Sequence, residues 1–512
     1  MIATMKRIIS LILVIIMVFT IVSCGNDTAD ATTPLTTEAT TEAVTEATTV
    51  ATTEATTVAT TEAVTEATTE ATTAEEPYVP PVYENAEFDE SRIVLSLAAV
   101  SDTHVIEKQT DVSVTRLRGA LAQLENKAQE HDADGLDGVL VVGDLINNAS
   151  RAQLEIFKQT YEKSVDIDKV PLIYCLGDDH DVDWDTDCSD TIAMFISTFG
   201  EKYYTTDIEP DMIPTGNRHC VIGGYHFICL EPTHRSPITY PENVKEWLDA
   251  TLAELTAENP NQYVFILTHA MITDTCYGSD LGTAWATSDL TDILSKYPQV
   301  ITFGGHLHYP INDERSIMQD KFTSVGCGAV RYLAMEPGYQ KESGTVPSDA
   351  YEVSTGLLVQ LDAYGNMRIT RMDLANKAEI KSAWEISYPN EDGTHLGKYT
   401  AARADINEAP VLSGDITATV NGRNVTLNFA AASDDDMIHH YVVTLTKKST
   451  GRSSTAKYLS GFYRKPQPSD MAKTFSCLVE TLTSGAEYSA SVVAVDSWGA
   501  ESNALTVDFM IP

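Results

Sequence analysis

Short apolar runs separated by polar stretches recur along the middle of the chain, from about residue 91 to residue 389. Each run spans a few consecutive, mostly apolar positions and ends at a glycine or a polar residue, which is typical of a strand buried on both faces. Between the first two runs, residues 112–129 carry apolar side chains at helical spacing. This alternation predicts an α/β domain. The runs are Ile93–Val100, Val139–Val142, Pro171–Leu176, Tyr263–Leu267 and Val300–Phe303.

A cluster of Asp, Gly or His residues follows each of these predicted strands. Because sites in open α/β sheets form beyond the carboxyl ends of the strands, we expect the clusters to converge. Each cluster alone is a weak signal, since Asp-Thr-His is more often a turn or helix cap than a metal site. Five of them in strand context indicate one composite site. The clusters are Asp102-Thr103-His104, Gly143-Asp144, Asp179-His180-Asp181, Thr268-His269 and Gly305-His306-Leu307-His308.

Carboxylates and imidazoles together are the ligands that suit Mn, Fe and Zn. The clusters supply enough of them for two adjacent metal ions, and one carboxylate between the ions can bridge them. A two-metal site clamps a phosphoryl group in line and lowers the pKa of a water molecule, which then acts as the nucleophile. The pattern therefore predicts hydrolysis of a phosphoester. The glycines beside Asp144 and His306 are expected to let the backbone turn sharply next to the ions.

These blocks resemble the calcineurin-like metallophosphoesterase superfamily, whose pattern is D-x-H, G-D, G-N-H-D/E, H and G-H-x-H, over roughly residues 93–375. The resemblance implies a β-sandwich flanked by helices, and two divalent transition-metal ions, Mn, Fe or Zn, with a bridging hydroxide. It implies that Asp102, His104 and His308 hold the first metal, that Asp144 bridges, and that Asp179, His269 and His306 hold the second. His180 is then the general acid or a phosphate hydrogen-bond donor, oriented by Asp181.

The chain departs from this pattern in one block. Where the family has Gly-Asn-His-Asp, the sequence reads Gly177-Asp178-Asp179-His180-Asp181. An Asp oxygen can ligate as the Asn amide oxygen does, and its negative charge would reduce the Lewis acidity of the ion. Asp179 is the predicted ligand because it directly precedes His180. There are two alternatives. Asp178 is the ligand through a shifted register, or the second metal is lost.

Residues 409–512 show a different pattern, with short alternating runs separated by polar turns. This pattern predicts an all-β sandwich. The stretches Leu482–Tyr488 and Val495–Gly499 resemble a fibronectin type III domain, which implies a spacer or a binder of protein or glycan. The predicted strands are Ile416–Val420, Val425–Phe429, His440–Leu445 and Tyr488–Val495, and His439-His440 is expected on one of them.

The first residues predict export. Lys6 and Arg7 precede the apolar run Ile8–Val22, which suits a signal peptide. The segment Ile21–Gly25 resembles a bacterial lipobox, so residues 1–23 are the expected signal and Cys24 the expected lipidation site, with an uncleaved anchor or plain secretion as alternatives. The chain is then an extracytoplasmic lipoprotein, held at the membrane by lipid alone.

A Thr/Glu/Ala-rich linker at residues 24–81 is expected to be disordered, and the metallophosphoesterase domain to span residues 82–390. The formal net charge of −40 argues against binding to a nucleic-acid polymer. The 8 cysteines include no CxxC pair, and their pairing stays open.

The sequence constrains the identity of the substrate less than it constrains the type of reaction. The residues after Asp144 lack the Val-Asp-Arg-Gly continuation of the protein Ser/Thr phosphatases, so a cyclic-nucleotide or other phosphodiesterase and a phosphomonoesterase remain as hypotheses. Trp184, Trp285 and Tyr277 follow ligand blocks and either stack on a substrate or pack in the core. The hypothesis from another class is a surface binding or adhesion protein with a catalytically silent phosphoesterase domain.

Overall fold

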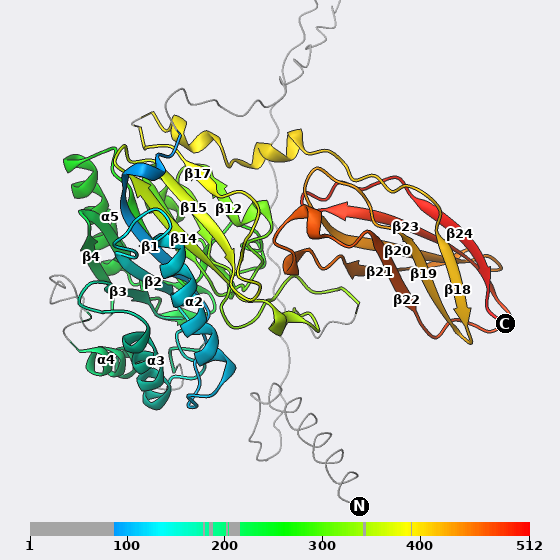
Figure 1. The fold of residues 1–512 in the computed structure, drawn as a ribbon, viewed down its shortest axis with the longest axis horizontal. Coiled ribbons are helices and arrows are strands. Elements are labelled where there is room, and N and C mark those ends of the chain that lie inside the picture. Colours follow the sequence, from blue (N-terminus) through cyan, green and yellow to red (C-terminus); the bar gives the residue numbers. More distant parts are fainter. Residues whose placement is uncertain are drawn as a thin grey trace, which may run out of the picture. The chain divides into compact units, whose positions relative to one another are not determined.

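The structure is a computed structural model (Figure 1) that describes residues 87–177, 180–183, 188–200, 203, 216–340, 345–390 and 392–512. The expected signal peptide, Cys24, the linker and Asp179 lie outside these residues. None of the described helices is long and apolar enough to cross a membrane.

The first sheet of the α/β domain has seven strands in the order β16-β15-β14-β1-β2-β3, with β17 paired to β15. Its three consecutive strands β1, β2 and β3 run parallel, whereas β14 pairs antiparallel with β1 and β15 pairs antiparallel with β14. The strands span Ile93–Val100 (β1), Gly138–Val142 (β2), Leu172–Cys175 (β3), Thr355–Asp362 (β14), Met367–Asp373 (β15), Ala378–Glu379 (β16) and Trp384–Ile386 (β17).

The second sheet has six strands in the order β12-β13-β11-β8-β5-β4. Strands β5, β8, β11 and β13 are parallel, and β12 and β4 close the two edges antiparallel. The strands span Arg218–Ile222 (β4), Tyr225–Cys229 (β5), Val264–Leu267 (β8), Val300–Gly304 (β11), Ile317–Gln319 (β12) and Thr323–Gly326 (β13); the short pairs are β6 (His234–Arg235) with β7 (Ile238–Thr239), and β9 (Met271–Ile272) with β10 (Ala286–Thr287).

Side-chain alternation along the strands divides the core into layers. In β1, Leu95, Leu97 and Ala99 pack against the second sheet, in a cluster that includes Phe265 and Phe303. The residues between them face the other way, toward helices. A strand buried on both faces needs apolar residues at every position, which explains the unbroken runs in the sequence.

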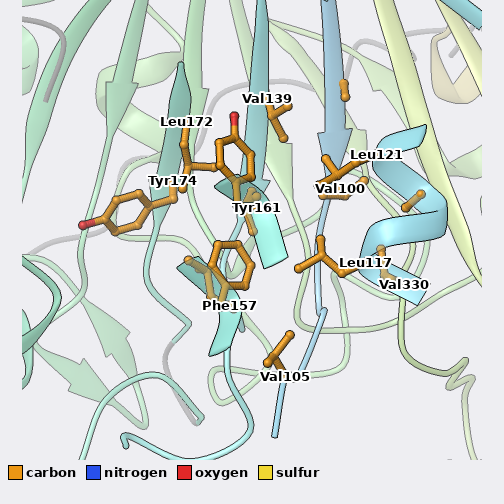
Figure 2. Packing of buried hydrophobic residues seen from close by; sticks show 14 of the residues in the cluster. Val100, Val105, Leu117, Leu121, Val139, Phe157, Tyr161, Leu172, Tyr174 and Val330 are labelled. Carbon is orange, nitrogen blue, oxygen red and sulfur yellow. The ribbon is translucent and has the colours of Figure 1, made fainter. Parts of the chain in front are cut away.

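Helices cover the outer face of each sheet, giving four layers. Figure 2 shows part of the cluster on the first sheet, where Leu117 and Leu121 of α2 lie beside Val100 of β1. On the second sheet, Leu248 and Leu252 of α5 pack with Ile266. The helices span Val112–Ala128 (α2), Arg151–Ser164 (α3), Cys188–Phe199 (α4), Glu242–Glu258 (α5) and Thr291–Leu294 (α6).

The C-terminal region is an antiparallel sandwich of a three-stranded sheet, β18-β19-β22, and a four-stranded sheet, β21-β20-β23-β24. Leu427 of one sheet and Val443 and Val492 of the other share its apolar core. His439 and His440 lie on β20, as predicted. The strands span Thr417–Asn421 (β18), Asn424–Ala430 (β19), Ile438–Lys447 (β20), Arg452–Leu459 (β21), Thr474–Val479 (β22), Glu487–Asp496 (β23) and Leu505–Met510 (β24).

These layers confirm the predicted fold class, an α/β sandwich flanked by helices with an all-β sandwich after it. Each predicted strand is present within a residue or two of its expected ends. Among the described cysteines, the buried Cys175, Cys220, Cys229, Cys276 and Cys327 form no disulfide.

Candidate metal centre

The loops after β1 and β2 of the first sheet and after β8 and β11 of the second meet at one edge of the domain. Backbone hydrogen bonds tie them together in pairs. The amide of Asp102 donates to the Gly143 carbonyl (3.2 Å) and that of His104 to the Asp144 carbonyl (2.9 Å). Across the second sheet, the Gly305 amide donates to the His269 carbonyl (2.8 Å). Residues far apart in sequence are thereby fixed side by side.

Left-handed backbone conformations are concentrated at this edge. Asp102, His104, Asp144, His306 and His308 have φ values of 54°, 42°, 51°, 64° and 55°. A non-glycine residue in this region costs on the order of 1 kcal/mol or more. Five such residues at one edge indicate that their side chains are held in place against the preference of the backbone.

Two glycines allow the close packing of these loops. Gly143 has φ +77°, and a Cβ there would lie 2.1 Å from Nδ1 of His269. A Cβ on Gly305 would lie 1.9 Å from Oγ of Ser101 and 2.8 Å from Oδ2 of Asp102. The loops carrying the carboxylates and imidazoles could not approach this closely with any other residue at these positions.

Four of the predicted ligands form one compact group. Ligand atoms of Asp102, His104, Asp144 and His308, all buried, lie within 4.8 Å of one another. Nε2 of His308 is 2.9 Å from Oδ1 of Asp102 and 3.1 Å from Nε2 of His104. This is the set expected around the first metal, with the expected bridging carboxylate beside it.

Asp144 also faces the other half of the site. Its Oδ2 is 3.7 Å from Nε2 of His104 and 3.4 Å from Nε2 of His269. The His269 ring in turn lies beside that of His306, with centroids 5.0 Å apart. One carboxylate oxygen therefore lies between imidazoles of two different groups, which is the placement that a bridging ligand needs.

Backbone carbonyls orient the imidazoles of the two groups. Nδ1 of His269 bonds the Val142 carbonyl (2.9 Å), and Nδ1 of His308 bonds that of Tyr332 (2.9 Å). Nε2 of His306 bonds the Ala284 carbonyl (3.0 Å). A carbonyl only accepts, so each of these nitrogens carries the proton and the opposite nitrogen presents its lone pair.

Electrostatics favour a charged carboxylate at Asp102. Burial alone would raise its pKa, but the imidazoles of His308, His269 and His104 hold the pKa well below its usual range. Its Oδ2 is buried and accepts no hydrogen bond from the described residues. A buried carboxylate oxygen without a donor among the described residues, amid imidazole nitrogens, fits a cation. Asp102, His104, Asp144 and His308 would hold one ion, and Asp144, His269 and His306 a second.

His180 lies next to this group. Its ring meets that of His104 edge to face, with centroids 4.5 Å apart. Its Nδ1 donates to the Asn147 carbonyl at 2.8 Å, which fixes the orientation of the ring. His180 also lines a cavity of about 320 Å³ that reaches His306 and His308.

Backbone amides hold the carboxylate of Asp181, the residue expected to orient His180. Its carboxylate accepts from the amides of Leu145 (3.0 Å), Ile146 (2.9 Å) and Gly177 (2.8 Å), while the Asn147 carbonyl holds Nδ1 of His180. Burial raises the pKa of Asp181 to about 7, against the lowering effect of these amides. Asp181 therefore joins the Asp144 loop to the His180 loop, since backbone donors from both converge on it.

Two buried side chains beneath the His180 loop were not predicted. Glu231 accepts from the Leu176 amide (2.7 Å), and the Arg218 guanidinium donates to the Tyr174 carbonyl. Burial raises the pKa of Glu231 to about 7, while Arg218 lowers it. Glu231 follows strand β5, so the rule of a polar residue after a strand would have found it. Arg218 begins a strand and carries no such signal.

The aromatic residues that follow the ligand blocks were expected either to stack on a substrate or to pack in the core, and they differ in their positions. Tyr277 is half-buried and is not part of the described lining of the cavity beside His180; its hydroxyl donates to Glu336 (2.5 Å). Trp285 instead lines the cavity beside His180 and is 41% exposed. Tyr332, which was not predicted, packs on His308 with ring centroids 4.2 Å apart. Trp184 lies outside the described residues.

No protein-family model matches the chain, and no curated protein matches it. Solved structures with a similar fold include the purple acid phosphatase PPD1 from yellow lupin (Lupinus luteus) seeds, at 15% identity over 62% of this chain and 57% of that chain, with a TM-score of 0.41. This chain thus spans less than two thirds of the lupin protein. PhoD is similar at 10% identity over 58% of this chain and 72% of that chain, with a TM-score of 0.36.

For the C-terminal region, the third fibronectin III domain of human KIAA0343 protein is similar at 13% identity. It covers 21% of this chain and 86% of that chain, with a TM-score of 0.17. Identities and TM-scores this low assign no family, so the function has to be inferred from the site itself.

Proposed function

We propose that the chain is a metal-dependent hydrolase of phosphoesters with a dinuclear site between its two sheets. The observation that carries this proposal is the position of Asp144, whose Oδ2 lies 3.7 Å from Nε2 of His104 and 3.4 Å from Nε2 of His269. A carboxylate shared by two sets of nitrogen and oxygen ligands suits a pair of Mn, Fe or Zn ions.

The groups of the proposed site have different roles. Bound ions would supply Lewis acidity toward a phosphoryl oxygen and lower the pKa of water. His180 is placed by Asn147 so that Nε2, when protonated, hydrogen-bonds a phosphoryl oxygen or gives its proton to the leaving oxygen. Asp181 keeps the loops of Asp144 and His180 together through three backbone amides.

A catalytically silent binding protein is the competing proposal. It would retain the fold without needing the strained and buried ligand set, because backbone strain and buried charge cost stability. The strain at Asp102, His104, Asp144, His306 and His308 therefore favours the enzyme.

The test is hydrolysis by the metal-stripped chain after addition of Mn, Fe, Zn or Mg. Bis(p-nitrophenyl) phosphate reports diester cleavage, and p-nitrophenyl phosphate reports monoester cleavage. Turnover that appears only with added metal supports the proposal, and the ratio of the two rates distinguishes a phosphodiesterase from a phosphatase. Two bound metals with no turnover of either ester would favour the binding protein.

We also propose that the enzyme acts outside the cytoplasm, attached to the membrane through Cys24. Lys6 and Arg7, the apolar run Ile8–Val22 and the small Ser23 before Cys24 support this proposal. Mass spectrometry of the mature N-terminal peptide should find a lipid on Cys24. Release of the Cys24→Ala variant from membranes would agree, and an unprocessed Met1 terminus would contradict the proposal.

A further inference from the structure

The cavity beside the proposed metal centre has two unlike walls. His180, His306 and His308 form the wall on the metal side. The remaining wall is mainly apolar and aromatic, and includes Leu281, Trp285 and Tyr332. A cavity of about 320 Å³ is at the lower end of the size range for small-molecule sites, so it suits a single ring or a short apolar group.

Exposed apolar side chains surround this cavity. Trp285 is 41% exposed and Leu281 is 38% exposed, although large apolar side chains are usually covered. Tyr351, 58% exposed, lies against Tyr332 with ring centroids 5.3 Å apart. Exposed apolar groups gathered beside a polar centre are typical of a ligand-binding surface.

Trp285 is fixed relative to the candidate ligands. Its ring lies 5.0 Å from that of His306, between centroids, at an angle of 31°. The residue before it, Ala284, accepts the hydrogen bond from Nε2 of His306. Tyr332, which also lines the cavity, packs on His308, and its backbone carbonyl accepts a hydrogen bond from Nδ1 of His308. Both aromatic rings are thus attached to residues of the metal centre.

The charge of the cavity is equally informative. Its described lining contains no Lys, Arg, Asp or Glu. Among these described lining residues, a second phosphate or another strongly charged group of the substrate would find no counter-charge and would lose its hydration. The single phosphoryl group would be met by the metals and His180, and the rest of the substrate by apolar surface.

We infer that the substrate is a phosphoester whose organic group is neutral, apolar and about one ring in size, packed against Trp285 and Tyr332. This inference rests on the proposed function, because the phosphoryl group has to lie at the metal centre. It disfavours polyanionic polymers and nucleoside polyphosphates as substrates.

The test compares phenylphosphonate with methylphosphonate, which share a phosphoryl anion and differ only in the organic group. Calorimetric titration of the full chain loaded with Mn, at a pH at which both compounds are dianions, should show at least about tenfold tighter binding of phenylphosphonate. Trp285→Ala should reduce that advantage to about threefold or less, and Leu281→Ser should reduce it in the same direction. Tyr364→Ala removes an aromatic ring that is 56% exposed elsewhere in the domain and should leave the advantage unchanged.

Equal affinities in the parent chain, binding of neither phosphonate, or an advantage that survives both cavity variants would overturn the inference. Hydrolysis of bis(p-nitrophenyl) phosphate by the same preparations separates the two proposals. Metal-dependent turnover without a phenyl preference rejects only the substrate class. A phenyl preference without turnover on any ester rejects the hydrolase.

Discussion

The α/β domain and the C-terminal sandwich differ in where backbone strain and buried charge lie. Of the nine described non-glycine residues with positive φ, five are predicted ligands at one edge of the α/β domain, whereas residues 409–512 contain one, Thr481. Strand β19 of the sandwich alternates regularly between buried and partly buried positions. Residues 409–512 also contain no cluster of potential ligands, and the α/β domain has one. Backbone strain costs stability, so its concentration at one edge marks the region where function compensates for that cost.

Removing the shared carboxylate is expected to have the largest effect. Asp144→Ala should lower metal-dependent hydrolysis by at least about 10³-fold, because it takes a ligand from both ions. The assay is the initial rate at saturating Mn. Asp249→Ala removes a surface carboxylate paired with Lys296 and should leave the rate unchanged. If Asp144→Ala keeps more than a tenth of the activity, Asp144 is not a bridging ligand.

Removing the proposed proton donor should have a smaller effect. His180→Ala should lower kcat by about 10²-fold, the usual contribution of general acid catalysis, and leave the metal content unchanged. The measurement pairs kcat with elemental analysis of the same sample. His131→Ala, at an imidazole beside Glu90, is the control. Loss of metal together with activity would assign His180 to the ligands instead.

One matched pair of glycines compares the two regions directly. In Gly143→Ala the new Cβ would lie 2.1 Å from Nδ1 of His269, and we expect a loss of about 3 kcal/mol or more in the free energy of unfolding. In Gly422→Ala, in the turn between β18 and β19, φ is +59° with nothing within 4 Å, so the expected loss is about 1 kcal/mol. Denaturant unfolding measures both. Equal losses would mean that the packing of His269 on Gly143 adds nothing beyond backbone strain.

Metal binding should slow hydrogen exchange near the site in the α/β domain and leave hydrogen exchange in the C-terminal sandwich unchanged. We expect added Mn to slow hydrogen exchange at the amides of Leu145, Ile146 and Gly177, since their acceptor Asp181 joins the two ligand loops. Amides of β20 and β23 should exchange at the same rate with and without Mn. Equal protection in both regions would show that the metal stabilises the chain as a whole.

The parts of the molecule that were predictable are those in which local sequence agrees with the layer structure. The runs at β1, β2, β8 and β11 are mostly apolar because both faces are covered, so these strands could be located. The polar residue after each strand could then be placed at a common edge. Strands β14 and β15 were not predicted individually, because the pairing of β14 with β1 and of β15 with β14 is tertiary.

The supporting contacts of the site could not be predicted. The Val142, Ala284 and Tyr332 carbonyls that orient the imidazoles are backbone atoms, and every residue has one. Asp181 was expected to orient the adjacent His180. Its carboxylate is held instead by backbone amides brought to it from the Asp144 loop, which adjacency in sequence does not indicate.

The central claim is that Asp144 lies between two metal ions, and anomalous X-ray diffraction from crystals grown with Mn tests it most directly. The account predicts two peaks about 3.5–4 Å apart on either side of the Asp144 carboxylate. One should contact Asp102, His104 and His308, and the other His269 and His306. A single peak, or none within ligand distance of Asp144, would contradict the dinuclear site.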